Sequence, residues 1–127
     1  MRIVLDTNIL ARANPRASGP ARQVLIDIAE SPDHVLIVSS FILRELERVL
    51  SYPRVQSIWP LGVDEIAEYV QALESFAELV QPRVGAGWPQ LLKDPSDDPV
   101  LQTALVGRAD ILCTLDRHFY TQAALEF

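Results

Sequence analysis

The most constraining feature of this sequence is a short apolar run, residues 3–5, that stops at the carboxylate of Asp6. An uninterrupted run of this kind is typical of a strand buried on both faces of a parallel sheet. In open α/β sheets, ligands bind in the crevice beyond the carboxyl ends of the strands, so Asp6 would stand at such a crevice. The alternative is that Asp6 is only a helix N-cap, because Asp6-Thr7-Asn8 also suits a strand-to-helix connection.

Apolar runs and amphipathic segments alternate along the rest of the chain. This alternation predicts a single three-layer α/β/α domain over residues 1–127, with a mostly parallel central sheet. The expected strands cover residues 2–5, 35–38 and 111–114, with a possible short strand at 79–80, and the expected helices cover 20–30, 41–50, 64–76 and a segment that ends at Gly107. Ser18, Ser39-Ser40 and Asp64 are the expected N-caps, and Val24 and Phe76 are expected on buried helix faces.

Composition excludes several classes of protein. The 127 residues fit one domain with a real core, and a hydrophobic content of 49% argues against disorder. No apolar run approaches the ~18 residues of a membrane span, and the N-terminus lacks the apolar segment of a signal peptide. The single cysteine, Cys113, allows neither a disulfide framework nor a Cys-rich zinc site. We therefore expect a reducing, cytoplasmic setting.

The net charge of −6 argues against a simple phosphate-binding surface, which would normally be basic. Divalent metal ions held by clustered carboxylates would invert the local charge and reconcile this value with a nucleic-acid substrate. The basic residues are also nearly all arginine, with Lys93 the only lysine, and arginine suits bidentate contacts to phosphate.

Acidic residues recur at one kind of location in the predicted fold. Asp6 and Asp116 follow strands, Glu45 lies on the helix after the second strand, and Asp97 or Asp98 lies at a helix start. Since the carboxyl ends of parallel strands meet at one edge, these side chains can converge there. Oxygen ligands select Mg²⁺ or Mn²⁺, which activates water and holds a scissile phosphate. The alternatives are helix capping for the aspartates and a half-exposed surface position for Glu45.

The ordered motifs resemble a known family. Ile-Val-Leu-Asp6-Thr-Asn-Ile, Ser-Ser-Phe-Ile-Leu-Arg-Glu45-Leu, and Asp94-Pro-Ser-Asp-Asp with Ala104 and Ala109-Asp-Ile-Leu-Cys-Thr-Leu-Asp116 resemble the PIN domain. They are most similar to the VapC-like ribonucleases, the toxin components of bacterial toxin–antitoxin systems. The resemblance implies a Mg²⁺- or Mn²⁺-dependent endoribonuclease that acts on single-stranded RNA, forms a homodimer and is held inactive by a cognate antitoxin.

The resemblance also implies roles for individual residues. The catalytic and metal-binding acids would be Asp6, Glu45, Asp97 and Asp116, with Asp98 as the fallback for the third acid. Asn8 and Thr114 match polar residues that support such a site. Because they lie near the acidic motifs or on the segment after the first strand, four arginines are candidates for RNA contacts: Arg12, Arg44, Arg48 and Arg117.

Two departures from the family pattern and two competing functions stay open. Leu115 stands where the family usually has a small residue, and the final edge strand of the family is expected to be missing before Phe127. A haloacid-dehalogenase-type phosphatase also begins with an Asp after a strand, but it needs a second Asp where this chain has Asn8. The other alternative is a catalytically weak or inactive PIN-like module that binds RNA or a partner protein without cutting.

Overall fold

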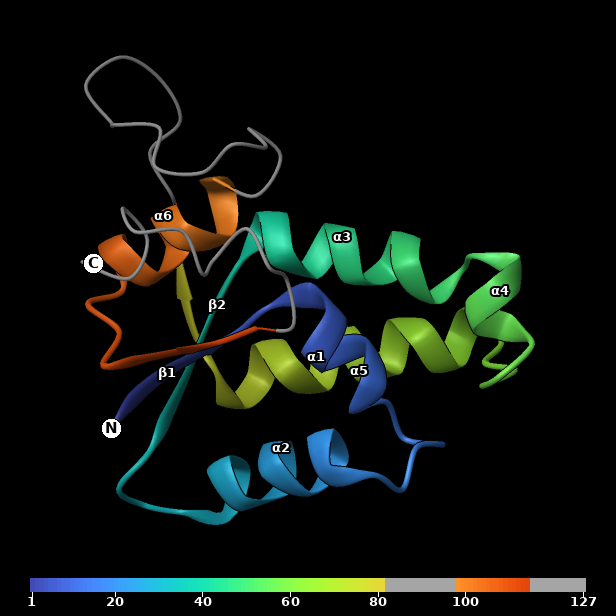
Figure 1. Ribbon diagram of the computed structural model, residues 1–127, viewed down its shortest axis with the longest axis horizontal. Coiled ribbons are helices and arrows are strands. Elements are labelled where there is room, and N and C mark those ends of the chain that lie inside the picture. Colours follow the sequence, from blue (N-terminus) through green and yellow to red (C-terminus); the bar gives the residue numbers. More distant parts are fainter. Residues whose placement is uncertain (82–97, 115–127) are drawn as a thin grey trace.

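The computed structural model describes residues 1–81 and 98–114, except for the side chain of Asp98 (Figure 1). Within these ranges four strands form one sheet: β1 (Arg2–Leu5), β2 (Val35–Ser39), β3 (Glu78–Val80) and β4 (Ile111–Cys113). Their order is β3-β2-β1-β4, and each described pair is parallel. The α/β class and the parallel sheet predicted from the sequence are therefore confirmed.

β1 lies at the centre of the described sheet because both of its edges are paired. Ile3 lies opposite Leu36 on one side and Ile111 on the other. Val4 and Leu5 are fully buried, as expected for a strand covered on both faces. The carboxyl ends of β1, β2 and β4 consequently share one edge, and Asp6 is the first residue beyond it.

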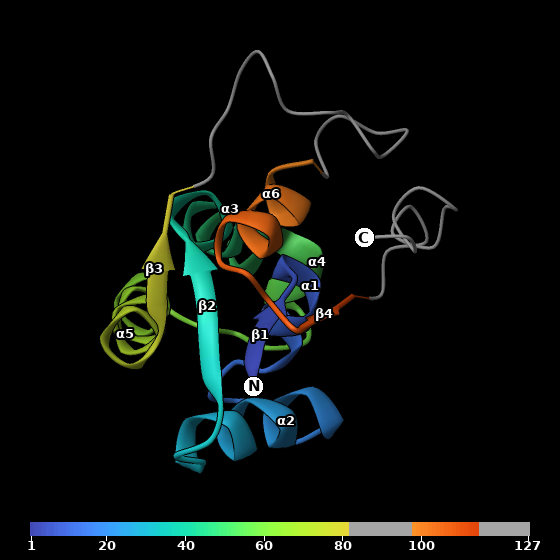
Figure 2. The same cartoon turned by 90° about the vertical axis from the view of Figure 1, so that its left-hand side faces the viewer.

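Helices cover both faces of the sheet. They are α1 (Thr7–Arg12), α2 (Pro20–Glu30), α3 (Ser40–Leu50), α4 (Pro53–Gln56), α5 (Val63–Phe76) and α6 (Asp98–Val106). Figures 1 and 2 show α6 on one face of the sheet and α1, α3 and α5 on the other, which gives the three layers. No helix in the ranges described is both long and apolar enough to cross a membrane.

The spans of α2, α3 and α5 agree closely with the predicted ones, whereas α1 and α4 lie outside the predicted helices, and two of the predicted caps are wrong. Gly19, and not Ser18, is the N-cap of α2, where Pro20 fixes the first helical position. Gly62, and not Asp64, is the N-cap of α5. The carboxylate of Glu65 accepts a hydrogen bond from the Gly62 N–H at 3.2 Å, so a side chain within the first turn satisfies the backbone there. Ser39 does cap α3, since its Oγ accepts from the Ile42 N–H at 3.2 Å.

Two residues expected on buried helix faces are exposed. Val24 on α2 and Phe76 at the end of α5 are each 41% exposed. On α2 the buried positions are Leu25 and Ile28, and Val24 lies about 100° around the helix from Leu25. Apolar spacing alone overestimated the width of each buried stripe, because the width depends on which neighbouring elements reach the helix.

Candidate active site at the carboxyl edge of the sheet

Asp6 is both a helix cap and a buried acidic group at the sheet edge. Its side chain caps α1, because Oδ1 accepts a hydrogen bond from the Ile9 N–H at 2.9 Å. Oδ2 accepts a hydrogen bond from the hydroxyl of Thr114, and the residue is only 4% exposed. The two interpretations of Asp6 left open by the sequence are therefore compatible. Each carboxylate oxygen has two lone-pair sites, so one on each remains for another partner.

Thr114 comes close to Asp6 because of the strand register. Leu5 lies opposite Cys113 in the parallel pair β1–β4, and the Asp6 N–H donates to the Cys113 carbonyl at 3.0 Å. Asp6 and Thr114, the residues that follow these two strands, therefore lie side by side at the carboxyl edge of the sheet. The hydroxyl of Thr114 restrains the orientation of the Asp6 carboxylate, and a supporting role for Thr114 in a functional site stays a prediction.

Two polar residues follow Asp6 at the start of α1. Asn8, expected to support the site, is exposed, and its side chain makes no hydrogen bond within the described residues. Thr7 is buried, and its Oγ1 has no hydrogen-bond partner among the residues described. A buried hydroxyl without a partner costs free energy. Thr7, next to Asp6 in the sequence, is therefore a further candidate for the site, and it was not proposed from the sequence. Its position between Asp6 and Asn8 was the only available signal.

Glu45 lies in the second turn of α3, the helix that follows β2, and its side chain is 28% exposed. It borders the buried stripe, as its position between Ile42 and Val49 predicts. Its carboxylate forms an ion pair with Arg48 one turn further along. That hydrogen-bonded ion pair raises the pKa of the Arg48 guanidinium. Because Arg48 is mostly exposed, the contact is easily exchanged for another partner.

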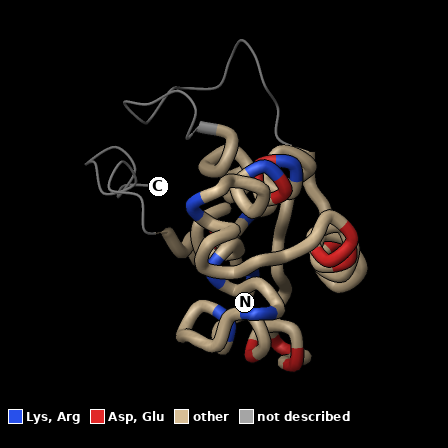
Figure 3. Tube along the Cα trace, turned by 90° about the vertical axis from the view of Figure 1, so that its right-hand side faces the viewer, with Lys and Arg blue, Asp and Glu red and all other residues tan. Residues whose placement is uncertain are grey.

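The candidate RNA-contacting arginines lie on two helices. Arg12 is exposed in the last turn of α1, and Arg44 and Arg48 are exposed on α3. Figure 3 shows basic and acidic positions side by side on α3, whereas the charged positions of α5 are acidic. Arg117 lies outside the described residues.

The remaining predicted acids stay predictions. Asp97 and Asp116 lie outside the residues that the structure describes, and Asp98 is the first residue of α6 but its side chain is not described. Within residues 1–81 and 98–114, no group of three or more His, Cys, Asp or Glu side chains gathers as a metal site. The described donors, Asp6 and Glu45, are carboxylates, and such oxygen ligands suit a hard divalent cation.

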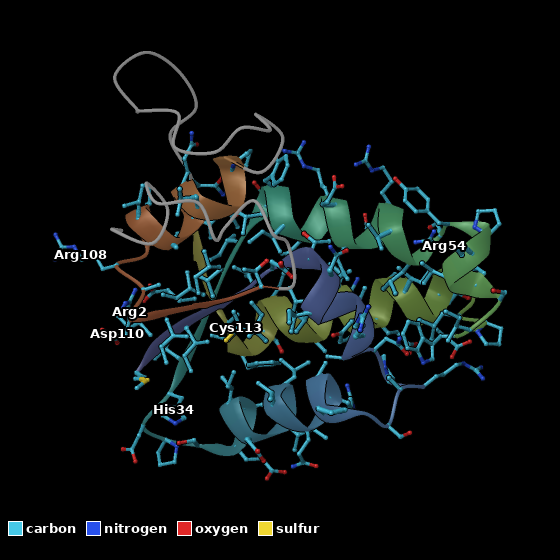
Figure 4. All side chains as sticks on the ribbon, in the orientation of Figure 1. Arg2, His34, Arg54, Arg108, Asp110 and Cys113 are labelled. Atoms are coloured by element: carbon cyan, nitrogen blue, oxygen red, sulfur yellow. The ribbon has the colours of Figure 1, made fainter. Side chains whose placement is uncertain are left out.

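Cys113 lies beside this edge, at the end of β4 (Figure 4). Its side chain is half-buried, and this burial, together with the nearby negative charge of Asp6, raises the pKa of the thiol. The thiol therefore stays protonated at neutral pH and is a poor nucleophile or metal ligand there.

Comparison with known proteins identifies the family. A family model described as the PIN domain matches residues 2–118. The chain belongs to the PIN-domain family. This match removes the dehalogenase-type phosphatase from consideration.

The fold of this PIN domain also has a counterpart among solved structures. It is similar to a chain in the "Crystal structure of VapBC2 from Rickettsia felis bound to a DNA fragment from their promoter", with a TM-score of 0.59 and 16% sequence identity. The similarity covers 94% of this chain and 91% of that one. A comparison with curated protein sequences found no match.

Proposed function

We propose that this PIN domain is a Mg²⁺- or Mn²⁺-dependent endoribonuclease that hydrolyses phosphodiester bonds of single-stranded RNA. We further propose that it is the VapC-like toxin of a toxin–antitoxin pair. The observation that carries the proposal is the Asp6 carboxylate, which is buried at the end of the central strand and hydrogen-bonded by Ile9 and Thr114. Parallel α/β sheets bind their ligands at this edge.

The residues that would hold the cation are Asp6, Glu45, Asp97 and Asp116, with Asp98 as the alternative third acid. When bound, such an ion supplies charge neutralisation at the phosphate and a water of lowered pKa. The chain contributes orientation, because the Thr114 hydroxyl and the Ile9 N–H restrain both oxygens of Asp6 before any ligand arrives. Glu45 would leave Arg48 to join the site, and that exchange costs little for an exposed ion pair.

Substrate and partner complete the proposal. Arg12, Arg44, Arg48 and Arg117 are proposed contacts to RNA phosphates, for which the planar guanidinium is suited. We take VapBC2 to be a toxin–antitoxin complex. The structural similarity of this chain to a chain of VapBC2 supports an antitoxin partner. A homodimer in a cytoplasmic setting belongs to the same proposal.

The decisive experiment measures cleavage of end-labelled single-stranded RNA by the purified protein with Mg²⁺ or Mn²⁺ and with EDTA. We expect metal-dependent cleavage that Asp6→Asn lowers by orders of magnitude, because one charge that holds the ion is lost. Asn also caps helices well, so Asp6→Asn should fold normally. Asp64→Asn on the exposed first turn of α5 is the matched control and should cleave like the wild type.

Metal binding can be measured without cleavage. Mg²⁺ or Mn²⁺ should raise the melting temperature of the wild type by mass action, and less so that of Asp6→Asn. Melting and cleavage that ignore both metal and EDTA would refute the metal site. RNA binding without metal-dependent cleavage would instead assign the alternative function, a non-cutting PIN-like binding module.

A further inference from the structure

The outward face of α3 carries basic and aromatic residues at helical spacing. Arg44, Arg48 and Tyr52 are four residues apart, so they lie on one side of the helix. Tyr52 lies two residues beyond Leu50, the end of α3, and is the N-cap of α4, but its N–H still donates to the Val49 carbonyl at 3.1 Å and keeps it close to the last turn of α3. The opposite side of α3 is the core side, where Ile42, Leu46 and Leu50 are fully buried. We call Arg44, Arg48 and Tyr52 the α3 track.

The α3 track is open to solvent. The side chain of Arg48 is 62% exposed and Tyr52 is 44% exposed. Arg44 is also exposed and makes no hydrogen bond or ion pair within the described residues. Arg54 on α4 adds another exposed cation just beyond Tyr52 (Figure 4).

Solvated arginines alone would be an ordinary helix surface. Tyr52, which is 44% exposed, adds the flat face of an aromatic ring at the next position of the same four-residue spacing. Cationic side chains along a strand's backbone, combined with an aromatic face for its bases, are the usual means of binding single-stranded nucleic acid. On a chain of net charge −6, the exposed cations Arg44 and Arg54 favour the approach of a polyanion to this part of the surface.

We infer that the α3 track binds the single-stranded RNA beside the scissile bond, with Arg44 and Arg48 at its phosphates and one base stacked on Tyr52. This inference rests on the proposed function, since Glu45 of the candidate site lies on the same helix. Tyr52 is seven residues beyond Glu45, which corresponds to roughly 10 Å along a helix. The stacked base is therefore a few nucleotides from the bond that is cut, so Tyr52 positions the strand and does not take part in the chemistry.

The test is equilibrium binding of dye-labelled single-stranded RNA to the full chain in EDTA, where metal-dependent cleavage cannot occur. We expect Tyr52→Leu to weaken binding by about 5-fold to 100-fold, because stacking on one base is lost. Tyr52→Phe keeps the ring and should bind like the wild type. Arg44→Gln and Arg48→Gln should each weaken binding and lower the salt dependence by about one phosphate contact. Arg108, at the far end of the molecule from Arg54 (Figure 4), is the control cation, and Arg108→Gln should change neither the RNA affinity nor its salt dependence.

Double-stranded RNA separates stacking from plain charge attraction, because its bases are not free to stack on a side chain. Tyr52→Leu should leave duplex binding unchanged. Equal single-strand affinity for Tyr52→Leu and wild type, or no measurable binding by the wild type, would overturn the α3 track. Neither result would refute the proposed function, which the metal-dependent cleavage and melting measurements decide separately.

Discussion

Ser39 and Thr103 are hydrogen-bonded through their side chains, with Oγ and Oγ1 2.9 Å apart and both residues fully buried. Ser39 ends β2 and caps α3, whereas Thr103 lies on α6 on the other face of the sheet. Thr103 Oγ1 is also 2.7 Å from the Pro99 carbonyl oxygen in the first turn of α6. This contact holds the start of α3 against α6. Glu45 lies on α3, and α6 begins at Asp98.

Thr103→Val should therefore destabilise the protein. It keeps the volume but removes the hydroxyl, and leaving buried polar groups without a partner costs about 1–3 kcal/mol. Chemical unfolding would measure the loss. Thr103→Ser retains the hydroxyl but removes a buried methyl, so it should show the cavity cost without the lost hydrogen bond. Equal stability for wild type and Thr103→Val would mean that this contact contributes nothing.

Gly107 follows α6 at a close approach to β2. A Cβ added there would meet Ile37 Cγ2 at 2.7 Å and the Thr103 carbonyl oxygen at 3.0 Å. Since the fully buried Ile37 has little room to move, Gly107→Ala should cost about 1–3 kcal/mol of unfolding free energy through overpacking. Gly19→Ser is the control, because nothing lies within 4 Å of its added Cβ and serine suits the N-cap of α2 at least as well as glycine. Similar melting temperatures for both variants would contradict the prediction.

The third acid of the candidate site can be identified by comparing Asp97→Asn with Asp98→Asn. If Asp97 is the ligand, its substitution should lower metal-dependent RNA cleavage by orders of magnitude. Asp98→Asn should then change cleavage much less, and it should cost little stability because Asn also suits a helix start. The reverse order of cleavage rates would assign the role to Asp98.

Cys113 predicts a pH dependence on the alkaline side. Folding raises the pKa of its thiol through burial, with Asp6 adding to the effect, so the native state holds this proton more tightly than the unfolded chain. The stability linked to Cys113 is complete below the unfolded thiol pKa of about 8.5 and declines as the pH rises through the folded pKa. The free energy of unfolding, measured from pH 7 to 10, should fall less steeply with pH for Cys113→Ala than for the wild type. Parallel profiles would mean that Cys113 does not ionise differently in the folded state.

The amino-acid sequence by itself determined the kinds of elements and most of their limits. The apolar run that ends at Asp6 identified β1, and alternating apolar spacings identified β2, α2, α3 and α5. These signals are local, because a strand or helix face is encoded by spacings within a few residues. The Ser39 cap was predictable for the same reason. The ordered motifs also identified the PIN family that the comparison confirmed.

Only the tertiary structure decided how these elements meet. The strand order that sets β1 between β2 and β4, and thereby places Thr114 against Asp6, depends on pairing across 108 residues of sequence. The Ser39–Thr103 contact and the close approach at Gly107 depend in the same way on packing between distant elements. Exposure at Val24 and Phe76 was mispredicted because a helix cannot encode which neighbours will cover it. Local spacing fixes which residues share a face, whereas the packing free energy of the whole chain fixes what that face touches.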